Sequence, residues 1–287
     1  MTVPLSIFVL TYNSESDIET CLQSIAGWAD ELFIVDSFST DKTIELAKKY
    51  TQNIHFHKFE NFAAQRNWAL ENLPIRNDWA LHLDADESLT PELKSEISEL
   101  IPNNTNGLDG FYIKRRFVFL NRWLRYGGNY PQTELRLWRH NLVRVIDAGA
   151  LEYIAVRGRV GTLQHDMIHE NRRGLSAWVT KVNMVSDWDA EEFMTGSGNA
   201  RLMAVDDSEY VELGKTRWLR IHVWNRLPLV LRPFLLFFFR YIIKLGFLDG
   251  TAGFIYCSLM HYWYYFLISS KVKEKRLIQR SMDKQAK

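Results

Sequence analysis

The first third of the chain alternates short apolar runs with segments of helical periodicity, and this alternation restricts the fold more than any other feature. Apolar runs of strand length lie at 6–10, 31–35, 54–57 and 81–83. Between them, apolar residues recur at helical spacing over 18–27, 42–50 and 63–73. Strands and helices in this order build a mostly parallel central sheet with helices on both faces. We therefore predict an α/β fold for this part of the chain.

Polar side chains follow three of these runs, at the point where each predicted strand ends. Thr11, Tyr12 and Asn13 follow the first run, Asp36 ends the second, and Asp84 and Asp86 end the fourth. In open α/β sheets, ligands bind at the carboxyl ends of the strands. These side chains are therefore predicted to surround one site at one edge of the sheet.

The pair Asp84 and Asp86 has two interpretations. Carboxylate oxygens suit Mg²⁺ or Mn²⁺, and such ions are usually held by one or two carboxylates together with substrate phosphates. Alternatively, the two side chains cap the helix that is predicted to begin near Pro91. The convergence of several strand ends favours a site for a metal and a diphosphate. The sequence contains neither G-x-G-x-x-G nor G-x-x-x-x-G-K-[ST], so a dinucleotide-binding Rossmann site and a P-loop are excluded.

Composition and charge indicate a globular protein, its cellular compartment and the kind of surface it contacts. The chain has 287 residues, of which 47% are hydrophobic, so it can bury a large core. Its two cysteines are too few for a disulfide framework or a cysteine-based zinc site, which favours a reducing, cytoplasmic setting. Residues 1–100 carry 7 Lys or Arg against 17 Asp or Glu, whereas residues 201–287 carry 15 against 7. A basic end of this kind predicts contact with an anionic surface.

Four short motifs, in this order, carry a resemblance to a known family. They are Leu10-Thr11-Tyr12-Asn13, Val35 to Asp41, Gln65-Arg66-Asn67 and Leu83 to Glu87. In combination they resemble the family-2 inverting glycosyltransferases of the GT-A fold. The resemblance extends through Glu134 to Arg139 and Gly246 to Gly250 to a branch similar to bacterial lipopolysaccharide-core β-glucosyltransferases, and so covers nearly the whole chain. It implies a GT-A nucleotide-sugar-binding fold.

The resemblance also implies a role for each matching residue. A UDP-sugar donor would be held by Thr11, Tyr12, Asn13, Asp36, Arg66, Asn67 and Asp84, and a Mn²⁺ or Mg²⁺ ion by Asp86 and His169. The metal would act as a Lewis acid that stabilises the departing UDP. Contacts with the acceptor or the diphosphate are expected from Arg136, Arg139 and Tyr130.

An inverting transferase also needs a carboxylate that takes the proton from the attacking hydroxyl. Glu152 is the first candidate, because it falls where related sequences place a His-Glu pair. Leu151 replaces the histidine of that pair here, which keeps Glu134 and Asp147 as alternatives.

Residues 110–139 interleave arginines with aromatic side chains. Such a mixture can bind single-stranded nucleic acid by stacking, and it can equally hold sugars and phosphates. The acidic sheet edge argues against nucleic acid. The region is therefore assigned to recognition of the acceptor.

The end of the chain has the pattern of a membrane-interface region. Residues 227–246 are very apolar but contain Arg232, Arg240 and Lys244, which fall with Arg226 within one arc of a helical wheel. Residues 251–270 lack charged side chains and are rich in aromatics, which suits the interface better than a transmembrane span. We predict a catalytic domain at 1–225 and a membrane-associating helical region at 226–287, and hence a peripheral protein on the cytoplasmic face of the bacterial inner membrane. A transmembrane hairpin, and a helical region for dimerisation or for covering the core, are the alternatives.

Together these features predict a metal-dependent inverting transferase. It would move a hexose, glucose in the first instance, from a UDP-sugar to a lipid-linked saccharide in lipopolysaccharide-core or other surface-glycan synthesis. One alternative is a nucleotidyltransferase acting on sugar phosphates, which would need a Gly-rich, Lys-bearing loop where Thr11 to Ser14 stand. The other is a non-catalytic, membrane-docked saccharide-binding module.

Overall fold

The computed structural model describes residues 2–104, 107–148, 151–195 and 227–285. Within them a nine-stranded sheet has the order β3-β2-β1-β4-β8-β6-β11-β5, with β7 paired to β6. Its strands are β1 (Val3–Thr11), β2 (Ala29–Asp36), β3 (Ile54–Phe56), β4 (Trp79–Asp84), β5 (Glu87–Leu89), β6 (Gly110–Phe119), β7 (Arg122–Trp123), β8 (Gln132–Arg139) and β11 (Val160–Glu170). A separate two-stranded sheet consists of β9 (Val143–Ala148) and β10 (Leu151–Val156).

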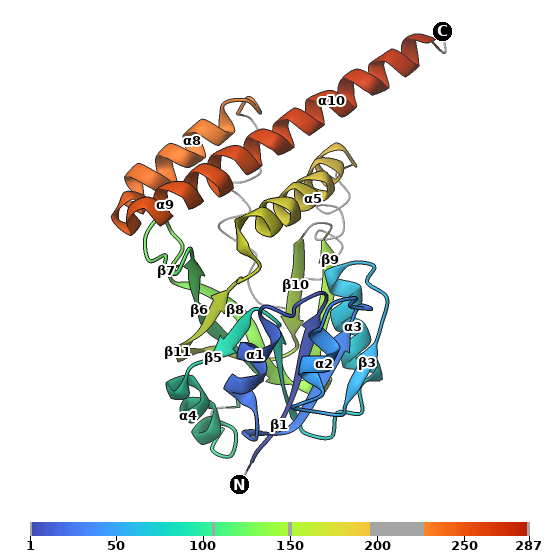
Figure 1. Cartoon of the computed structure of the whole chain (residues 1–287), viewed down its shortest axis with the longest axis vertical. Helices are drawn as coiled ribbons and strands as arrows, with labels where there is room; N and C mark the ends of the chain where they lie inside the picture. The colour runs from blue at the N-terminus through green and yellow to red at the C-terminus, as the bar shows by residue number, and fades with distance from the viewer. Residues whose placement is uncertain (1, 105–106, 149–150, 196–226, 286–287) are drawn as a thin grey trace.

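Helices flank the sheet and form the C-terminal part of the described chain (Figure 1). The helices before residue 196 are α1 (Ile18–Ile25), α2 (Thr43–Ala47), α3 (Phe62–Asn72), α4 (Pro91–Leu100) and α5 (Gly174–Thr195). The C-terminal helices are α8 (Arg232–Phe238), α9 (Gly250–Tyr256) and α10 (Tyr264–Gln285), joined by helical turns at Phe239–Ile243, Gly246–Asp249 and Cys257–Trp263. In Figure 1 these last helices lie at the end of the molecule opposite the N-terminus, and α5 lies between α10 and the strands.

The predicted α/β fold is confirmed, and the sheet is mixed. Strands β3, β2, β1 and β4 run parallel to one another, as the alternation of strands and helices predicts. Strand β8 then runs antiparallel to both β4 and β6, and β5 runs antiparallel to β11. The register of the parallel part pairs Thr11 with Asp36 and Leu10 with Asp84, so that three polar strand ends lie side by side.

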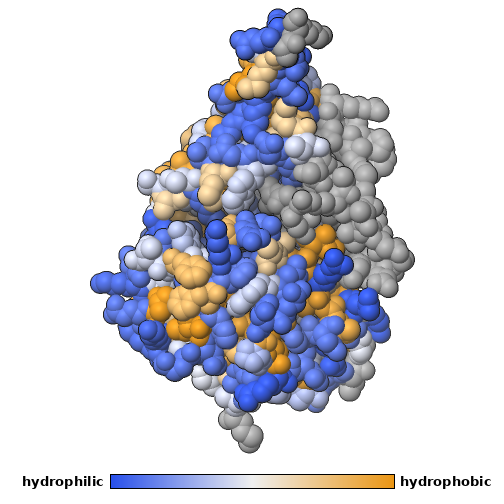
Figure 2. Space-filling view, turned by 90° about the vertical axis from the view of Figure 1, so that its right-hand side faces the viewer, coloured by the Kyte–Doolittle hydropathy of each residue, from blue (hydrophilic) through white to orange (hydrophobic). Residues whose placement is uncertain are grey.

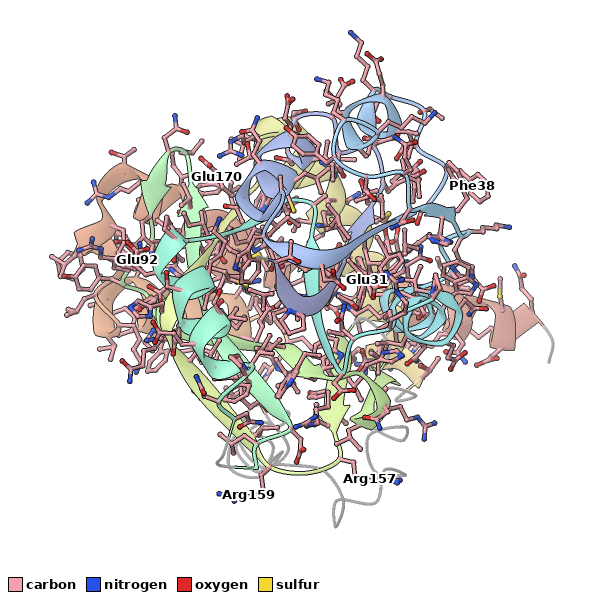
Figure 3. The ribbon with its side chains drawn as sticks, turned by 90° about the horizontal axis from the view of Figure 1, so that it is seen from below. Glu31, Phe38, Glu92, Arg157, Arg159 and Glu170 are labelled. Atoms are coloured by element: carbon pink, nitrogen blue, oxygen red, sulfur yellow. The ribbon has the colours of Figure 1, made fainter. Side chains whose placement is uncertain are left out.

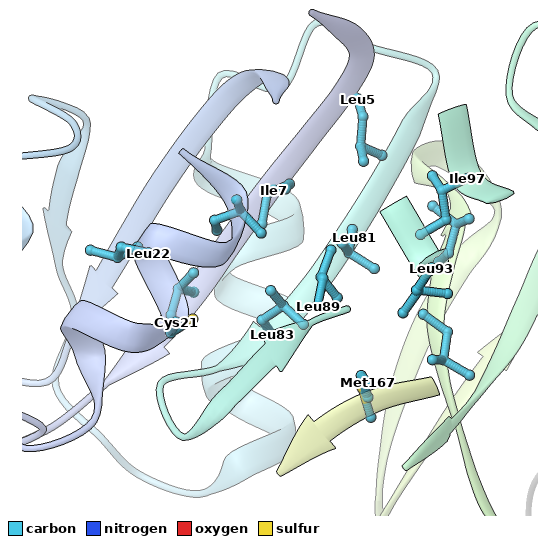
Figure 4. Packing of buried hydrophobic residues seen from close by; sticks show 14 of the residues in the cluster. Leu5, Ile7, Cys21, Leu22, Leu81, Leu83, Leu89, Leu93, Ile97 and Met167 are labelled. Carbon is cyan, nitrogen blue, oxygen red and sulfur yellow. The ribbon is translucent and has the colours of Figure 1, made fainter. Parts of the chain in front are cut away.

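Two apolar cores lie on opposite faces of the sheet. Because successive side chains of a strand point to opposite faces, Leu5 and Ile7 of β1 pack on one face and Phe8 on the other. The first face meets the apolar stripes of α1 and α4, including Leu22 and Leu93 (Figure 4). The second face meets α3. The continuous apolar runs of the sequence therefore feed both cores, as expected for strands that are buried on both sides.

The amino edge of the sheet is closed by a buried carboxylate. Glu31 lies near the centre of the view in Figure 3, which looks at the molecule from below. It accepts hydrogen bonds from Ser6 Oγ at 2.6 Å and from Arg76 N at 3.0 Å. Burial alone would raise the pKa of Glu31, but the bonds from Ser6 and Arg76 lower it. The polar groups at this edge are therefore satisfied by neighbouring side chains and backbone, whereas a cavity opens at the opposite, carboxyl edge.

Helix α4 is capped by Thr90, not by Asp84 or Asp86. The Thr90 Oγ1 atom accepts a hydrogen bond from Leu93 N at 3.2 Å, and Pro91 occupies the first turn. The interpretation of the two aspartates as helix caps is therefore wrong, and their side chains are available for another purpose.

The C-terminal helices differ from the predicted amphipathic helix in their orientation. Arg232 is only 6% exposed, and Arg240 donates hydrogen bonds to the backbone carbonyls of Gly127 and Gly128, so these cations do not form an exposed stripe. The prediction of such a stripe is wrong, because a helical wheel separates two faces without telling which one packs inward. Arg226 and the boundary proposed at 225/226 lie outside the described residues. Among the described residues, no helix is both long and apolar enough to cross a membrane.

Candidate active site

A cavity of about 1680 Å³ opens at the carboxyl edge of β1 and β4. Side chains of α3, β8, β10 and β11 and one side of α5 form its walls. The residues predicted for the site that line it are Thr11, Tyr12, Arg66, Asp84, Asp86, Arg136 and His169, together with Glu134. The fold thus brings together residues from distant segments of the chain.

The loop after β1 is held in place by the loop after β2. Asp36 is fully buried and accepts hydrogen bonds from Ser39 N at 2.7 Å and Ser39 Oγ at 2.5 Å. Asn13, at φ 45°, donates from its N to Ser39 Oγ at 2.8 Å and accepts from Thr40 N at 2.8 Å. Asp36 and Asn13 do not line the cavity. They fix a loop that places Tyr12, 54% exposed, at the cavity wall.

Asp84 is fixed by two buried arginines. Arg66 Nη2 lies 3.2 Å from Asp84 Oδ1, and Arg136 Nη2 lies 2.8 Å from Asp84 Oδ2. Arg136 also pairs with Glu87 at 2.6 Å and with Glu134 at 2.7 Å. Burial alone would raise the pKa of Asp84, but Arg136 and Arg66 hold it well below its usual range. Because each of its oxygens faces a guanidinium, Asp84 is a fixed anion suited to accepting hydrogen bonds.

His82 and Glu87 complete this network, and neither is among the predicted site residues. Arg136 Nη1 lies 2.5 Å from His82 Nδ1, and burial together with the two arginines lowers the pKa of His82 to about 3. A neutral imidazole whose Nδ1 accepts carries its proton on Nε2, which lies 3.3 Å from Asp84 Oδ1. Burial raises the pKa of Glu87 to about 7, and its Oε2 accepts from Asp84 N at 3.0 Å. A histidine within an otherwise apolar strand was the available signal, since a buried polar ring needs partners.

Asp86 and His169 form a second pair beside this network. Strand β11 pairs with β5 so that His169 lies opposite Glu87, and this register places His169 Nε2 3.4 Å from Asp86 Oδ2. Phe117 packs against the imidazole with its ring centroid at 5.4 Å. Burial would raise the pKa of Asp86, but the charge and hydrogen bond of His169 lower it, and Asp86 in turn raises the pKa of His169.

The predicted residues Asn67, Arg139 and Tyr130 do not line the cavity. The Asn67 amide bonds the backbone of Val145, donating to its O at 2.7 Å and accepting from its N at 3.0 Å. Arg139 lies at the far end of β8, where it pairs with carboxylates at 3.6 and 3.7 Å. The Tyr130 hydroxyl donates to Asp166 at 3.1 Å. These contacts give the three residues structural roles in this arrangement.

The candidate proton acceptors fall in two places. Glu152 of β10 is paired in register with Asp147 of β9, and the side chains of both lie outside the described part of the chain. Tyr153 and Ile154, which follow Glu152, line the cavity. Glu134 lines the cavity as well, and its carboxylate is 2.7 Å from the Arg136 guanidinium. Burial would raise the pKa of Glu134, but the neighbouring arginines lower it, so it is a weak base.

Helix α5 adds cations that the sequence analysis did not assign. Arg173, just before it, donates to Tyr12 O at 3.1 Å and to Ser14 Oγ at 2.6 Å, and so ties the loop after β1 to the start of the helix. Lys181 lines the cavity and contributes to the lowered pKa of Asp86. The α5 residues on this wall are spaced as one helical face: Ser176, Ala177, Thr180, Lys181, Met184, Val185 and Trp188. The spacing could have been recognised in the sequence as one face of a helix. The position of that face, across the cavity from the carboxyl ends of β1 and β4, is known only from the structure.

Comparisons with known proteins identify the family of this chain. An uncharacterised glycosyltransferase of Rickettsia bellii is 37% identical over 97 residues, which are 34% of this chain and 32% of the relative, so the match spans about a third of that protein. The lipopolysaccharide core biosynthesis glycosyltransferase LpsC of Rhizobium meliloti is 26% identical over 197 residues, covering 66% of this chain and 72% of the relative. The crystal structure of S. aureus TarS in complex with UDP-GlcNAc superposes with a TM-score of 0.45 at 14% identity, over 96% of this chain and 92% of that one. The profile of "Glycosyl transferase family 2" matches residues 6–153, about half of the chain, and the protein is therefore a member of this family of glycosyltransferases.

Proposed function

We propose that this glycosyltransferase moves a hexose, glucose in the first instance, from a UDP-sugar to a lipid-linked saccharide with inversion and with a divalent metal. The observation that carries the proposal is the pairing of Asp86 with His169 beside an arginine-fixed Asp84, at the carboxyl edge of parallel strands. The similarity to LpsC supports an acceptor of lipopolysaccharide-core type or another surface glycan.

The cavity offers a place for each part of the donor. The exposed ring of Tyr12 is suited to stacking on the uracil. The fixed carboxylate of Asp84 is suited to accepting a hydrogen bond from a ribose hydroxyl. Lys181 faces the same end of the cavity as Asp86 and supplies a positive charge for the diphosphate. The two arginines that hold Asp84 are themselves neutralised by carboxylates, so they position the anion and leave the diphosphate to Lys181 and the metal.

The donor atoms of Asp86 and His169 fit a divalent metal. Neighbouring ligands of a six-coordinate ion with bonds of about 2.1 Å lie about 3 Å apart, close to the 3.4 Å between Asp86 Oδ2 and His169 Nε2. No group of three or more metal-binding side chains occurs among the described residues, so the substrate's phosphates would have to complete the ligand set. When bound, the metal supplies Lewis-acid stabilisation of the departing diphosphate. A mixed carboxylate and imidazole pair favours Mn²⁺ over Mg²⁺, which prefers oxygen ligands.

The rest of the cavity is suited to the acceptor. A volume of about 1680 Å³ exceeds the ~300–1,000 Å³ typical of a site for one small molecule, which leaves room for a saccharide beside the donor. Its wall also includes the packed rings of Phe59, Phe62 and Trp188, flat apolar surfaces of the kind that sugars stack on.

Detection of UDP release against a panel of sugar nucleotides tests the proposal. Release is expected with a UDP-hexose in the presence of Mn²⁺, with a lower rate in Mg²⁺, and EDTA is expected to reduce it at least about 100-fold, because the leaving diphosphate then lacks its counter-charge. Restoring Mn²⁺ should restore turnover. Release of pyrophosphate from a nucleoside triphosphate would instead identify a nucleotidyltransferase, and binding of saccharide without any turnover would identify a binding module.

Substitution of the two acidic residues that β9 and β10 pair in register, Asp147 and Glu152, tests which residue accepts the proton. Glu152→Gln is expected to lower kcat by about 10²- to 10⁴-fold with little change in the KM for the donor, because general-base catalysis acts on the acceptor hydroxyl. Asp147→Asn, at the position paired with it in the register, is the matched control and should retain turnover. The opposite pattern would assign the base to Asp147. A large loss in Glu134→Gln alone would move the role to the cavity carboxylate held by Arg136.

A further inference from the structure

The C-terminal helical segment exposes its apolar face, which is the reverse of a helix on the surface of a soluble protein. Such a helix normally buries its apolar face and exposes its charged one. Here Phe234 and Phe238 of α8 are 51% and 55% exposed. The exposed apolar side chains of this region form what we call the outer apolar face: Val230, Leu231, Phe234, Leu235, Phe238, Phe239, Ile242, Ile243, Leu245, Phe247, Leu248 and Phe254.

Two cations of the same segment, Arg232 and Arg240, point toward the protein. Arg232 is buried, donates from Nε to Leu227 O at 3.0 Å and lies over the ring of Phe193. Arg240 donates from Nη1 to the carbonyls of Gly127 and Gly128 at 3.1 and 3.2 Å. The bonds from Arg240 to carbonyls more than 100 residues away hold this side of the segment inward, and the phenylalanines of the opposite side therefore face outward.

The outer apolar face is fixed to the catalytic part by specific bonds. Asp249, almost fully buried, accepts from the backbone N atoms of Arg125 and Tyr126 at 3.1 and 2.9 Å. Gly127 N donates to Lys244 O at 2.8 Å. Phe119, Leu124 and Ala252 form a small core between the two parts. The exposed orientation is therefore built into the fold and does not depend on a loosely attached end.

Two basic side chains lie beside this face. Lys244 is exposed at its edge, and Arg122, near the turn between β6 and β7, donates to Leu248 O at 3.2 Å. Between residues 227 and 285 there are 9 Lys or Arg against 3 Asp or Glu, and one of those acids is the buried Asp249. Arg232 and Arg240 point inward, and Lys271 and Lys275 pair with α5. The remaining cations of α10 are exposed: Lys273, Arg276, Arg280 and Lys284. The projecting end of α10, at the top of Figure 2, is mostly hydrophilic. An apolar face of this composition with a cationic margin complements an anionic lipid surface, whose headgroups carry the opposite charge.

We propose that the outer apolar face docks the enzyme on an anionic lipid bilayer, with its phenylalanine and aliphatic side chains at the depth of the headgroups. A second protein chain could also cover the apolar side chains, but its binding would not require cations beside them, whereas binding to an anionic bilayer is strengthened by them. The inference deepens the proposed function, on which its connection to a lipid-linked acceptor rests. Helix α10 packs along α5, where Lys271 donates to Asn183 O at 2.9 Å and to Ser186 Oγ at 2.8 Å. Since α5 is a wall of the cavity, docking would hold the cavity at a fixed height above the lipid.

Vesicle flotation with the full chain tests the docking surface. The wild-type protein is expected to float with vesicles of phosphatidylcholine mixed with phosphatidylglycerol, and much less with phosphatidylcholine alone. The double variant Phe234→Ser/Phe238→Ser should bind at least about tenfold more weakly, because two apolar rings no longer leave water. Phe56→Ser, which removes a phenylalanine of 50% exposure from edge strand β3, is the matched control and should float like the wild type. Lys244→Glu tests the charge contribution and should weaken binding to the anionic vesicles only.

The outcomes separate this inference from the proposed function. A wild-type chain that stays in the soluble fraction, or a double variant that floats like the wild type, would overturn the docking surface. A dimer that the double variant converts to a monomer, without flotation of either, would assign the face to a second copy and overturn the inference as well. Vesicle binding without UDP-sugar turnover would support the docking surface and count against the proposed function.

Discussion

Asp86→Ala is expected to lower UDP-sugar turnover on the order of a thousandfold at saturating Mn²⁺, because the loss of Lewis-acid stabilisation of the leaving group is worth several kcal/mol. Asp86 is the carboxylate that remains for the metal, since both oxygens of Asp84 face guanidiniums. The fold itself should be unaffected. Burial lowers the pKa of His169 and Asp86 raises it, so without Asp86 the buried imidazole is left neutral and needs no charged partner.

Two measurements make this expectation specific. Titration of Mn²⁺ followed by electron paramagnetic resonance should show weakened binding in the presence of UDP, which a loss of activity alone would not establish. Asp78→Ala is the matched control: Asp78 lies just before the other end of β4, its side chain is 86% exposed, and its variant should turn over like the wild type. Undiminished activity of Asp86→Ala with Mn²⁺ would contradict the metal assignment.

The strand ends could be predicted from the sequence because the information is local. Apolar runs end at Thr11, Asp36 and Asp84, and parallel pairing of neighbouring strands brings such ends to one edge without any knowledge of long-range packing. The mixed half of the sheet could not be predicted in this way. Strand β8 enters beside β4 in the antiparallel direction, and its position depends on contacts between segments more than 50 residues apart in the chain, such as that of Arg136 with Asp84.

The predicted site residues that do not line the cavity have a common physical feature, which is side-chain direction. Asn67 follows Arg66 on a helix, where successive side chains are about 100° apart, so the two cannot both face Asp84. Arg139 lies three residues beyond Arg136 on a strand, which puts it on the opposite face and about 10 Å further along. A motif read as a string of letters carries no such direction. The same limit applies to the C-terminal segment, where Arg232 and Arg240 were identified as one stripe but their inward orientation was not.

Arg136→Leu is expected to destabilise the protein by about 3–5 kcal/mol, because it leaves buried carboxylates without the cation that neutralises them. Arg136 contacts Glu87 at 2.6 Å, Glu134 at 2.7 Å and Asp84 at 2.8 Å, and both Arg136 and Glu87 are almost completely buried. Urea unfolding monitored by tryptophan fluorescence measures the loss. Arg139→Leu, on the same strand, is the matched control, and its longer and more exposed ion pairs should make it worth at most about 1 kcal/mol.

The pH dependence of the destabilisation by Arg136→Leu distinguishes two causes. One is an uncompensated buried charge, and the other is the loss of the packing of the Arg136 side chain. Burial already raises the pKa of Glu87 to about 7 in the wild type, and Arg136 works against that rise, so its removal moves the folded-state pKa higher still. A carboxyl whose pKa is higher in the folded than in the unfolded state contributes stability at low pH and loses it as pH rises through the folded value. The cost of Arg136→Leu should therefore be larger at pH 8 than at pH 6. Adding Glu87→Gln, which cannot ionise, should recover part of the stability at pH 8; a cost that is equal at both pH values and unrelieved by Glu87→Gln would mean that Arg136 acts by filling space.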